Sequence, residues 1–342
     1  MSDPRTHDKN DLVVITGAGG FIGGHLVAEL VRQGHSRVRA VDIKPFDGWF
    51  QLVRGIDNRR LDLREREACE EAARGARSIY NLACDMGGMG FIETHKAECM
   101  LSVLINTHML AAARDARAER YLYSSSACVY AAGKQMTPDV TPLKEEDAYP
   151  AMPEDGYGWE KLFSERMCRH FYEDFGLETR VARYHNVYGP HGTFEGGREK
   201  APAALCRKVI EALRSGGRDI EVWGDGEQTR SFMYIDDCLF GTVALTASDV
   251  REPLNIGSDE LVTINQLLDI VEDIAGVTLT RRYNLNAPKG VRGRSSDNTR
   301  VKQKLGWAPA IKLRDGMERT YRWIHDQLMV PANARRGYSQ AW

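Results

Sequence analysis

The feature that most constrains the fold of this chain is a glycine-rich turn near its N-terminus. An apolar run at residues 12–16 is followed by glycines at 17, 20 and 23, and an amphipathic run then extends from Phe21 to Arg32. Glycines at this spacing permit a tight turn, the close approach of a pyrophosphate and the close packing of a helix on a strand. The segment predicts a strand–turn–helix unit that binds a dinucleotide through Gly17, Gly20, Phe21, Ile22 and Gly23.

A carboxylate at the end of the next strand-like run favours one kind of dinucleotide. The run Val38–Val41 is followed by Asp42, where a carboxylate can accept hydrogen bonds from ribose hydroxyls. The same charge repels a 2′-phosphate, so the sequence predicts NAD rather than NADP. Asp62 follows a third strand-like run, and we expect it either to contact the adenine side of the cofactor or to be a solvated loop acid.

The following residues repeat this alternation of strands and helices. Apolar runs near Ile79–Leu82, Tyr121–Ser124 and Arg180–Tyr184 are separated by segments with helical patterns. Strands that alternate with helices form a parallel sheet covered on both faces. The sequence predicts an α/β fold: a Rossmann-type doubly wound parallel sheet with a smaller, discontinuous C-terminal substrate lobe. The expected divisions are a disordered N-terminus at 1–10, the NAD-binding domain at 11–185 with a returning piece near 236–260, the lobe at 186–235 and 261–330, and a tail at 331–342.

The composition excludes several classes of function. The 342 residues carry 46 Lys and Arg against 48 Asp and Glu, so the net charge of −2 gives no field that would attract nucleic acid or an anionic membrane. No run approaches the roughly 20 apolar residues of a membrane span. The seven cysteines are scattered, and no CxxC pair suggests a zinc site or a disulfide framework. We expect a cytoplasmic protein with no metal, no nucleic-acid partner and no membrane partner.

A second group of residues carries acid–base chemistry. Tyr157 and Lys161 form a Tyr-x-x-x-Lys pair, and this spacing places both side chains on one face of a helix. A nearby ammonium lowers the pKa of a phenol, so Tyr157 can act as a base toward a hydroxyl group. Ser126 ends a run of three serines upstream and can supply the partner hydroxyl. These residues predict a site of hydride transfer beside the dinucleotide.

The glycine turn, the serine, the tyrosine and the lysine, in this order, resemble the extended short-chain dehydrogenase/reductase family over nearly all of residues 11–328. Two later segments, Arg183–Pro190 and Arg230–Asp237, look like further landmarks of that family. The resemblance implies a tightly held NAD and a nucleoside-diphosphate sugar in the cleft between the lobes. It also suggests paired helices in a homodimer, and the apolar stripe with Trp159 and Phe163 is expected to be core or part of that interface.

The residues after Ser126 narrow the reaction. Dehydratases of this family carry an Asp-Glu pair there, whereas this chain has Ala127-Cys128, which disfavours a 4,6-dehydratase. In an extended segment, the side chain of Cys128 emerges on the same side as that of Ser126. Lys200 stands in a glycine-loosened loop before a predicted helix. A thiol and a desolvated lysine suit acid–base work near neutral pH, so both residues are candidate extra bases.

Five longer blocks are similar to the GDP-mannose 3,5-epimerase family. They are Ala83–Phe91, Ser125–Cys128, Gly196–Ala204, Trp223–Phe232 and Gly290–Asn298. Five blocks spread over much of the chain are far more specific than a single motif.

This resemblance implies a role for each matching residue. It implies that Cys128 and Lys200 are an acid–base pair and that Ser126, Tyr157 and Lys161 serve a redox step. It further implies that the substrate is held by Gly87, Gly88, Met89, Asn186, Glu199, Lys200, Lys208, Gln228, Arg230 and Arg292, with Lys208 and Arg292 on the pyrophosphate.

The implied reaction is an epimerisation that consumes no cofactor. C4 of a GDP-hexose is oxidised transiently, C3 and C5 are inverted through the enolates beside the new ketone, and C4 is reduced again. The expected conversion is GDP-D-mannose to GDP-L-galactose, with GDP-L-gulose as the product of inversion at C5 alone. Two alternatives stay open: a single-centre epimerase of another GDP-activated sugar in a bacterial specialised-metabolite pathway, and a catalytically silent NAD-binding scaffold.

Overall fold

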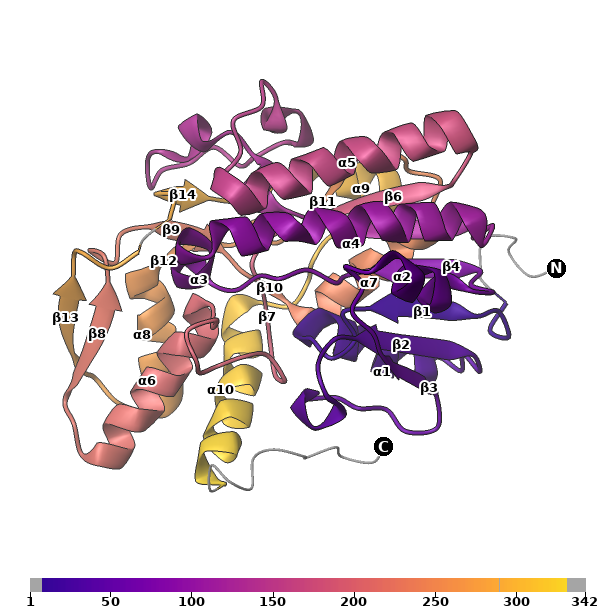
Figure 1. The fold of residues 1–342 in the computed structure, drawn as a ribbon. Coiled ribbons are helices and arrows are strands. Elements are labelled where there is room, and N and C mark those ends of the chain that lie inside the picture. The colour runs from indigo at the N-terminus through magenta and orange to yellow at the C-terminus, as the bar shows by residue number, and fades with distance from the viewer. Residues whose placement is uncertain (1–7, 289, 331–342) are drawn as a thin grey trace.

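The computed structural model describes residues 8–288 and 290–330, and a seven-stranded parallel sheet forms its centre (Figure 1). The strands lie in the order β11-β6-β5-β4-β1-β2-β3, so the chain winds outward from β1 in both directions. The prediction of an α/β, doubly wound, Rossmann-type sheet is therefore confirmed. The strands are β1 (Val13–Thr16), β2 (Val38–Asp42), β3 (Asp57–Arg60), β4 (Ser78–Asn81), β5 (Arg120–Ser126), β6 (Thr179–Tyr184) and β11 (Leu254–Ile256).

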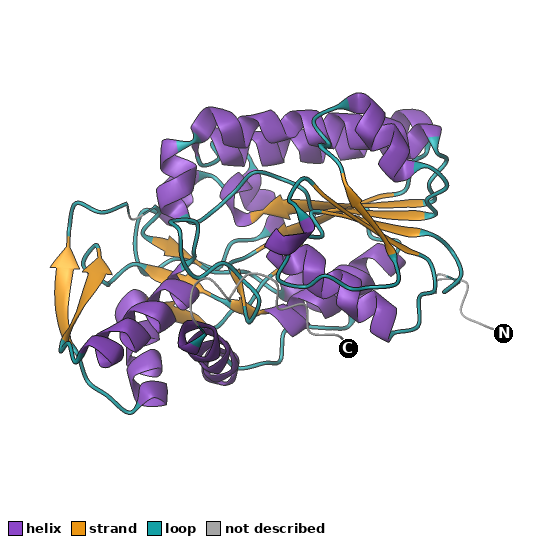
Figure 2. Ribbon diagram, turned by 60° about the horizontal axis from the view of Figure 1, so that its bottom comes forward, coloured by secondary structure: helices purple, strands orange, loops and turns teal. Residues whose placement is uncertain are grey.

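Helices cover both faces of this sheet (Figures 1 and 2). One layer contains α2 (Arg66–Ala73), α4 (Lys96–Asp115) and α5 (Asp155–Phe175), and the other contains α1 (Phe21–Arg32) and α7 (Ile235–Ala247). Nearly every residue of the central strands is buried, as expected for strands that are covered on both sides. Within the described ranges, no helix has both the length and the apolar character that crossing a membrane requires.

The predicted elements of the first half agree with those of the structure. The helix predicted at Phe21–Arg32 has these bounds, and Leu254–Ile256 returns to the sheet beside β6. The serine run ends β5, because Ser125 and Ser126 pair with the last two residues of β6. This pairing carries the serines to the carboxyl edge of the sheet, where ligands bind in open α/β folds.

The remaining elements gather at that carboxyl edge. α6 (Ala201–Ser215), α8 (Ile264–Ala275) and α10 (Leu313–Met329) pack on one another, as Figure 1 shows. The shorter elements are α3 (Met89–Thr94), β7 (Val187–Tyr188), β8 (Asp219–Trp223), β9 (Thr229–Ser231), β10 (Met233–Tyr234), β12 (Leu261–Thr263), β13 (Thr280–Asn284) and β14 (Gly293–Arg294). The short helix α9 (Thr299–Leu305) lies instead beside β11 of the central sheet.

One buried apolar cluster joins the sheet to these later elements. It extends from Ile15 of β1 to Leu267 of α8 and Met317 of α10. The two parts of the chain therefore share a core, and the division into a nucleotide-binding domain and a substrate lobe stays a prediction. Residues 1–7 of the expected disordered N-terminus and the expected tail at 331–342 lie outside the described residues.

The turn after β1 provides a direct test of this packing. A Cβ on Gly23 would lie 2.2 Å from the carbonyl oxygen of Gly17, whereas a Cβ on Gly48 would meet nothing within 4 Å. We expect Gly23→Ala to lower the free energy of unfolding by about 1–3 kcal/mol and to weaken NAD binding, because the helix must move away from the turn. Gly48→Ala is the matched control and should change neither property. Thermal unfolding and cofactor titration check this, and equal behaviour of the two variants would contradict it.

Candidate active site

The glycine-rich turn lies where the strand order reverses, between β1 and β4. A Cβ on Gly17 would lie 2.8 Å from the carbonyl oxygen of Leu82, which follows β4, and a Cβ on Gly20 would lie 3.1 Å from the carbonyl oxygen of Gly17. Gly17 also has a φ of +70°, which residues with a side chain rarely adopt. Among the described residues, no side chain caps the N-terminus of α1, so its backbone amides suit a pyrophosphate.

Asp42 holds its carboxylate against this turn. Its Oδ2 accepts a hydrogen bond from the backbone N–H of Gly19 at 2.9 Å, and its Oδ1 accepts one from the N–H of Lys44 at 3.0 Å. The turn and the carboxylate together fit the phosphates and the ribose of NAD. Asp62 differs, because its carboxylate receives the guanidinium of Arg64, with Nε 2.9 and 3.1 Å from its two oxygens. Asp62 thus forms an ion pair within its loop, and its contact with the adenine side of the cofactor stays a prediction.

Ser126, Tyr157 and Lys161 come together at the end of β5. Their exposed fractions are 8%, 5% and 1%. Lys161 donates a hydrogen bond from Nζ to the backbone carbonyl of Ser124 at 3.0 Å, and Nζ lies 5.5 Å from the centroid of the Tyr157 ring. The spacing of four residues places tyrosine and lysine on one face of α5, as predicted.

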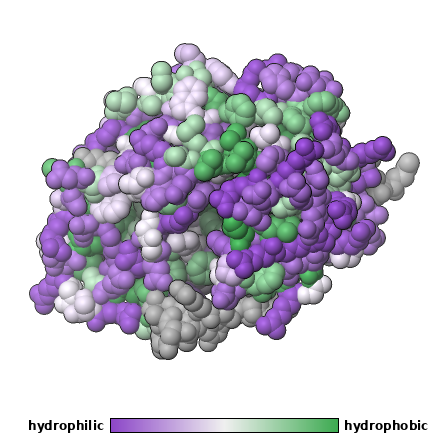
Figure 3. Space-filling view, in the orientation of Figure 1, coloured by the Kyte–Doolittle hydropathy of each residue, from purple (hydrophilic) through white to green (hydrophobic). Residues whose placement is uncertain are grey.

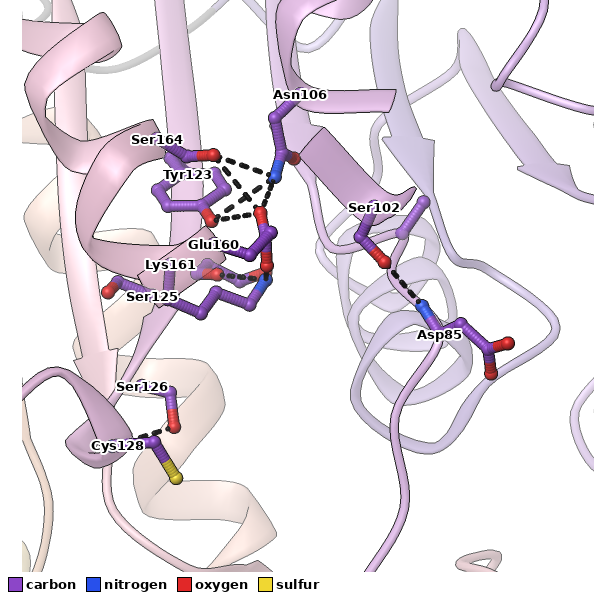
Figure 4. Close-up of polar contacts among 12 residues, drawn as sticks. Asp85, Ser102, Asn106, Tyr123, Ser125, Ser126, Cys128, Glu160, Lys161 and Ser164 are labelled. Carbon is purple, nitrogen blue, oxygen red and sulfur yellow. Dashed lines mark hydrogen bonds and ion pairs between the residues drawn. The ribbon is translucent and has the colours of Figure 1, made fainter. Parts of the chain in front are cut away.

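A buried carboxylate that the sequence reasoning missed lies beside this lysine. Oε2 of Glu160 is 3.7 Å from Nζ of Lys161, and both side chains are at most 1% exposed. Its Oε1 accepts hydrogen bonds from the hydroxyls of Tyr123 at 3.2 Å and Ser164 at 3.0 Å and from the amide of Asn106 (Figure 4). Adjacent residues on a helix normally point in different directions, so their positions in the sequence do not indicate this pair.

The pKa of Tyr157 departs from what the Tyr-x-x-x-Lys motif predicted. Burial raises the pKa of the phenol well above its ordinary value, and nearby thiols raise it further. Among the main causes, only a hydrogen bond with Ser126 lowers this pKa. The ammonium of Lys161 is directed at the carbonyl of Ser124 and at Glu160. The predicted lowering of the phenol pKa by this lysine is therefore wrong for this structure.

One cavity unites the redox residues with the candidate acid–base pair. It is lined by Ser126, Cys128 and Tyr157 and, from the loop before α6, by Lys200. Cys128 lies in a short 3-10 helix (Ala127–Val129), and its backbone N–H donates to Oγ of Ser126 at 3.2 Å (Figure 4). The two side chains are neighbours as predicted, although a helical turn rather than an extended segment joins them.

Lys200 occupies an environment opposite to that of Lys161. It is half-buried at the N-terminal end of α6, and no hydrogen bond of its Nζ occurs among the described residues. Burial lowers the pKa of Lys200 from its ordinary value, and only the thiols around it, including that of Cys128, oppose the effect. A lysine with a lowered pKa exchanges protons more readily near neutral pH.

Most of the predicted substrate-binding residues line the same cavity. Glu199 and Gln228 each have a buried side-chain oxygen with no hydrogen-bond partner among the described residues, which leaves acceptors for a ligand. Arg230 is half-buried there, and burial lowers its pKa to about 10. The predicted residues found in the lining are Gly87, Gly88, Met89, Asn186, Glu199, Lys200, Lys208, Gln228 and Arg230.

Arg292 is the predicted substrate-binding residue that the structure does not bring to this lining. Its Nη1 lies 3.0 Å from each carboxylate oxygen of Asp225. Arg294 lines the cavity instead, with Nη1 3.6 Å from Sγ of Cys128 and Nε donating to Gln135 at 2.7 Å. The Val-Arg-Gly-Arg segment contains two arginines, and the sequence alone does not indicate which of them reaches the cavity.

The histidine that precedes the cavity residue Asn186 has a structural contact. His185 is fully buried, its Nε2 lies 3.0 Å from Oδ1 of Asn255, and burial lowers its pKa to about 4. No group of three or more His, Cys, Asp or Glu side chains in the described part of the chain is arranged to hold a metal ion.

Lys161 and Lys200 should respond in opposite ways to the same substitution. Lys161→Met leaves Glu160 buried without its counter-charge, and we expect it to lower the free energy of unfolding by about 3–5 kcal/mol. Lys200→Met removes a half-buried ammonium that has no hydrogen bond among the described residues and whose pKa is lowered, so it should raise the unfolding temperature at pH 7.

The pH dependence checks the cause of the second effect. The folded state disfavours the proton on Lys200, so the protonated side chain lowers the free energy of unfolding. This destabilisation is complete below the lowered pKa and disappears above the ordinary lysine pKa. The gain from Lys200→Met should therefore shrink as the pH of the thermal unfolding experiment rises. A variant less stable than the wild type at pH 7 would contradict this interpretation.

Comparisons with known proteins agree with this arrangement. The NAD dependent epimerase/dehydratase family matches residues 13–257. GDP-mannose 3,5-epimerase 1 of Oryza sativa subsp. japonica is 48% identical over 317 residues, which are 92% of this chain and 82% of that protein. The GDP-mannose 3,5-epimerase of Arabidopsis thaliana is 46% identical over 94% of this chain and 84% of its own length. A UDP-glucose 4-epimerase of Thermotoga maritima has the same fold, with a TM-score of 0.82 and 24% identity over 92% of this chain and 99% of that one. The chain belongs to the NAD dependent epimerase/dehydratase family, whose cofactor is NAD.

Proposed function

We propose that this protein is an epimerase of a GDP-hexose that inverts C3 and C5 of GDP-D-mannose to give GDP-L-galactose. The main support is that one cavity is lined both by the redox residues Ser126 and Tyr157 and by the acid–base candidates Cys128 and Lys200. Relatives with 46–48% identity over most of the chain carry the name of this activity. A 4-epimerase needs no second acid–base pair, so Cys128 and Lys200 favour inversion at carbons beside C4.

We propose that NAD is held by the glycine turn and Asp42. Bound there, NAD would supply the hydride acceptor for oxidation at C4 of the sugar and the hydride donor for its reduction. As a phenolate, Tyr157 takes the proton of the C4 hydroxyl, and this role requires the positive charges of bound NAD and of Lys161 to offset the effect of burial on its pKa. Ser126 donates a hydrogen bond to the same oxygen. Lys161 stays charged beside Glu160 and orients Tyr157 from one helical turn away.

Cys128 and Lys200 are proposed to carry out each inversion. The C4 ketone acidifies the C–H bonds at C3 and C5, because the carbanion at either carbon is delocalised as an enolate. One residue of the pair removes this proton and the other delivers a proton to the opposite face of the same carbon. Because NAD is regenerated at C4, the net reaction is an isomerisation.

The remaining lining residues are proposed to hold the sugar nucleotide. Asn186 and the unpaired oxygen of Glu199 suit sugar hydroxyls, and the unpaired oxygen of Gln228 suits an N–H of the base. Lys208 and Arg230 line the cavity and supply charge for the diphosphate.

We propose that the protein works as a homodimer in the cytoplasm. Large apolar side chains are exposed on the outer surface that the neighbouring helices α4 and α5 share. Figure 3 shows apolar patches in the region where Figure 1 places these two helices. The proposed use of the Cys128 thiol requires a compartment that keeps thiols reduced. The exposed side chains of this face are Met100, Leu101, Leu104, Trp159 and Phe163.

Proton exchange with solvent tests the proposed reaction directly. Purified protein is incubated with GDP-mannose in deuterated water and the sugar is followed by proton NMR. Deuterium at both C3 and C5, with the L-galactose configuration appearing, is the expected result. Exchange at C5 alone would identify a single-centre epimerase. No exchange would contradict GDP-mannose as the substrate, and parallel samples with other GDP-sugars would then separate another substrate from a silent scaffold.

Two variants test the assigned acid–base pair. Cys128→Ser and Lys200→Ala are each expected to reduce the rate of deuterium incorporation by about 100-fold or more, since each removes one proton carrier. Both should still bind NAD, which cofactor titration measures. A variant with the wild-type exchange rate would remove that residue from the proposed mechanism.

The proposed dimer makes a separate prediction. Phe163→Glu places a charge on the exposed apolar face of α5 and should convert the dimer to a monomer in analytical ultracentrifugation. Tyr283→Glu is the control, because Tyr283 is exposed to a similar degree on β13, away from this face. A wild-type protein that sediments as a monomer would contradict the proposal.

A further inference from the structure

The loop that carries Glu199 and Lys200 contacts the segment between β4 and α4, which lines the other side of the cavity. It starts at Gly196 and Gly197, whose φ angles are +87° and +83° and whose Cβ positions would meet no other atoms within 4 Å. The loop ends at Lys200, the residue that precedes α6. Because Nζ of Lys200 has no hydrogen bond among the described residues, the position of this lysine depends on the backbone of the loop.

The side chain of Arg198 ties this loop to the segment between β4 and α4. Its Nη1 donates to Oδ1 of Asp85 at 2.6 Å and to the carbonyl oxygen of Met86 at 3.2 Å. Its guanidinium carbon also lies 3.7 Å from the centroid of the Phe91 ring. An ion pair and a cation–π contact thus hold one side chain from two directions.

The backbones of the two segments make an independent contact. The N–H of Gly88 donates to the carbonyl oxygen of Arg198 at 3.0 Å. A Cβ on Gly88 would lie 2.4 Å from the carbonyl oxygen of Glu199, so only glycine permits this approach. Gly88 therefore allows the 196–200 loop to pack closely on this segment. This role is additional to the substrate contact that the sequence suggested.

The segment between β4 and α4 that contacts Arg198 is itself held by other parts of the fold. The backbone N–H of Asp85 donates to Oγ of Ser102 on α4 at 3.0 Å, and in Figure 4 the carboxylate of Asp85 points away from this bond. Phe91 is 7% exposed and stacks on His95 with ring centroids 4.3 Å apart. Both partners of Arg198 are thus anchored to the helical layer of the fold.

We propose that Arg198 is a positioning residue that latches the 196–200 loop across the cavity and thereby sets Lys200 for the inversion step. The inference rests on the proposed function for the role of Lys200, and on the observed contacts for the latch itself. Asp85 and Arg198 are each about 45% exposed, and exposed ion pairs contribute only about 0–1 kcal/mol, so the latch can open when a substrate enters and close over it. Releasing the latch should affect proton transfer by Lys200 more than cofactor binding or global stability.

Arg251 supplies a matched control for Arg198. It also pairs with a carboxylate, with Nη2 2.9 Å from Oε1 of Glu178, and its guanidinium also lies over an aromatic ring, 4.3 Å from the centroid of Tyr172. It does not line the cavity. Arg251→Ala removes the same kinds of contact at a place where the proposal predicts no effect on the reaction.

Backbone hydrogen exchange tests the latch without any substrate. Arg198→Ala should increase the exchange rate of the amides in residues 196–200 and the rate at which acetic anhydride labels Lys200, while Arg251→Ala leaves both unchanged. Both variants should keep the wild-type affinity for NAD. Unchanged exchange and labelling in Arg198→Ala would overturn the latch.

Deuterium incorporation into GDP-mannose tests the positioning role. We expect Arg198→Ala to reduce kcat for incorporation at C3 and C5 by about 10-fold to 100-fold, because small misplacements of a catalytic group have effects of this size. The reciprocal pair Asp85→Arg with Arg198→Asp restores the ion pair and should recover part of the loss. A wild-type kcat in Arg198→Ala, with the loop loosened, would overturn the positioning role. If the wild type itself incorporates no deuterium, the proposed function has failed, and hydrogen exchange and lysine labelling alone then decide for or against the latch.

Discussion

The ammonium of Lys161, sealed inside the protein, is the charge on which the candidate active site depends. A buried ammonium keeps its proton only where groups inside the protein replace the lost water. The carbonyl of Ser124 and the carboxylate of Glu160 do so here, and Glu160 is held in turn by groups from β5, α4 and α5. The helical layer that carries the exposed apolar face thus also supplies the charge balance of the site.

The parts that the sequence predicted are those fixed by local geometry. The glycine turn could be assigned because a Cβ at Gly17 or Gly23 would collide with backbone a few residues or one strand away. Tyr157 and Lys161 could be assigned because a helix converts a spacing of four into a shared face. The doubly wound parallel sheet could be predicted because strands that alternate with helices leave few ways to connect a parallel sheet.

The parts that the sequence could not give depend on contacts between distant segments. Arg292 and Arg294 are equivalent as residue types, and their folded partners separate them: Arg292 pairs with Asp225, whereas Arg294 contacts Cys128 and Gln135. Glu160 looked like an ordinary helical glutamate because its partners come from three different elements. The pKa of Tyr157 was predicted in the wrong direction, because the motif specifies the neighbouring lysine and not the depth of burial.

The two lysines of the site show how the fold gives one residue type two chemistries. The carboxylate of Glu160 favours the charged form of Lys161, whose task in the proposed mechanism is to orient and not to transfer protons. Burial without such a partner lowers the pKa of Lys200, which the proposed inversion requires to exchange a proton in every cycle. The backbone of the 196–200 loop sets how deeply this ammonium lies in the protein, and burial is the main cause of its lowered pKa. The contacts of Arg198 and Gly88 with the opposite wall therefore bear on the acidity of Lys200 as well as on its position.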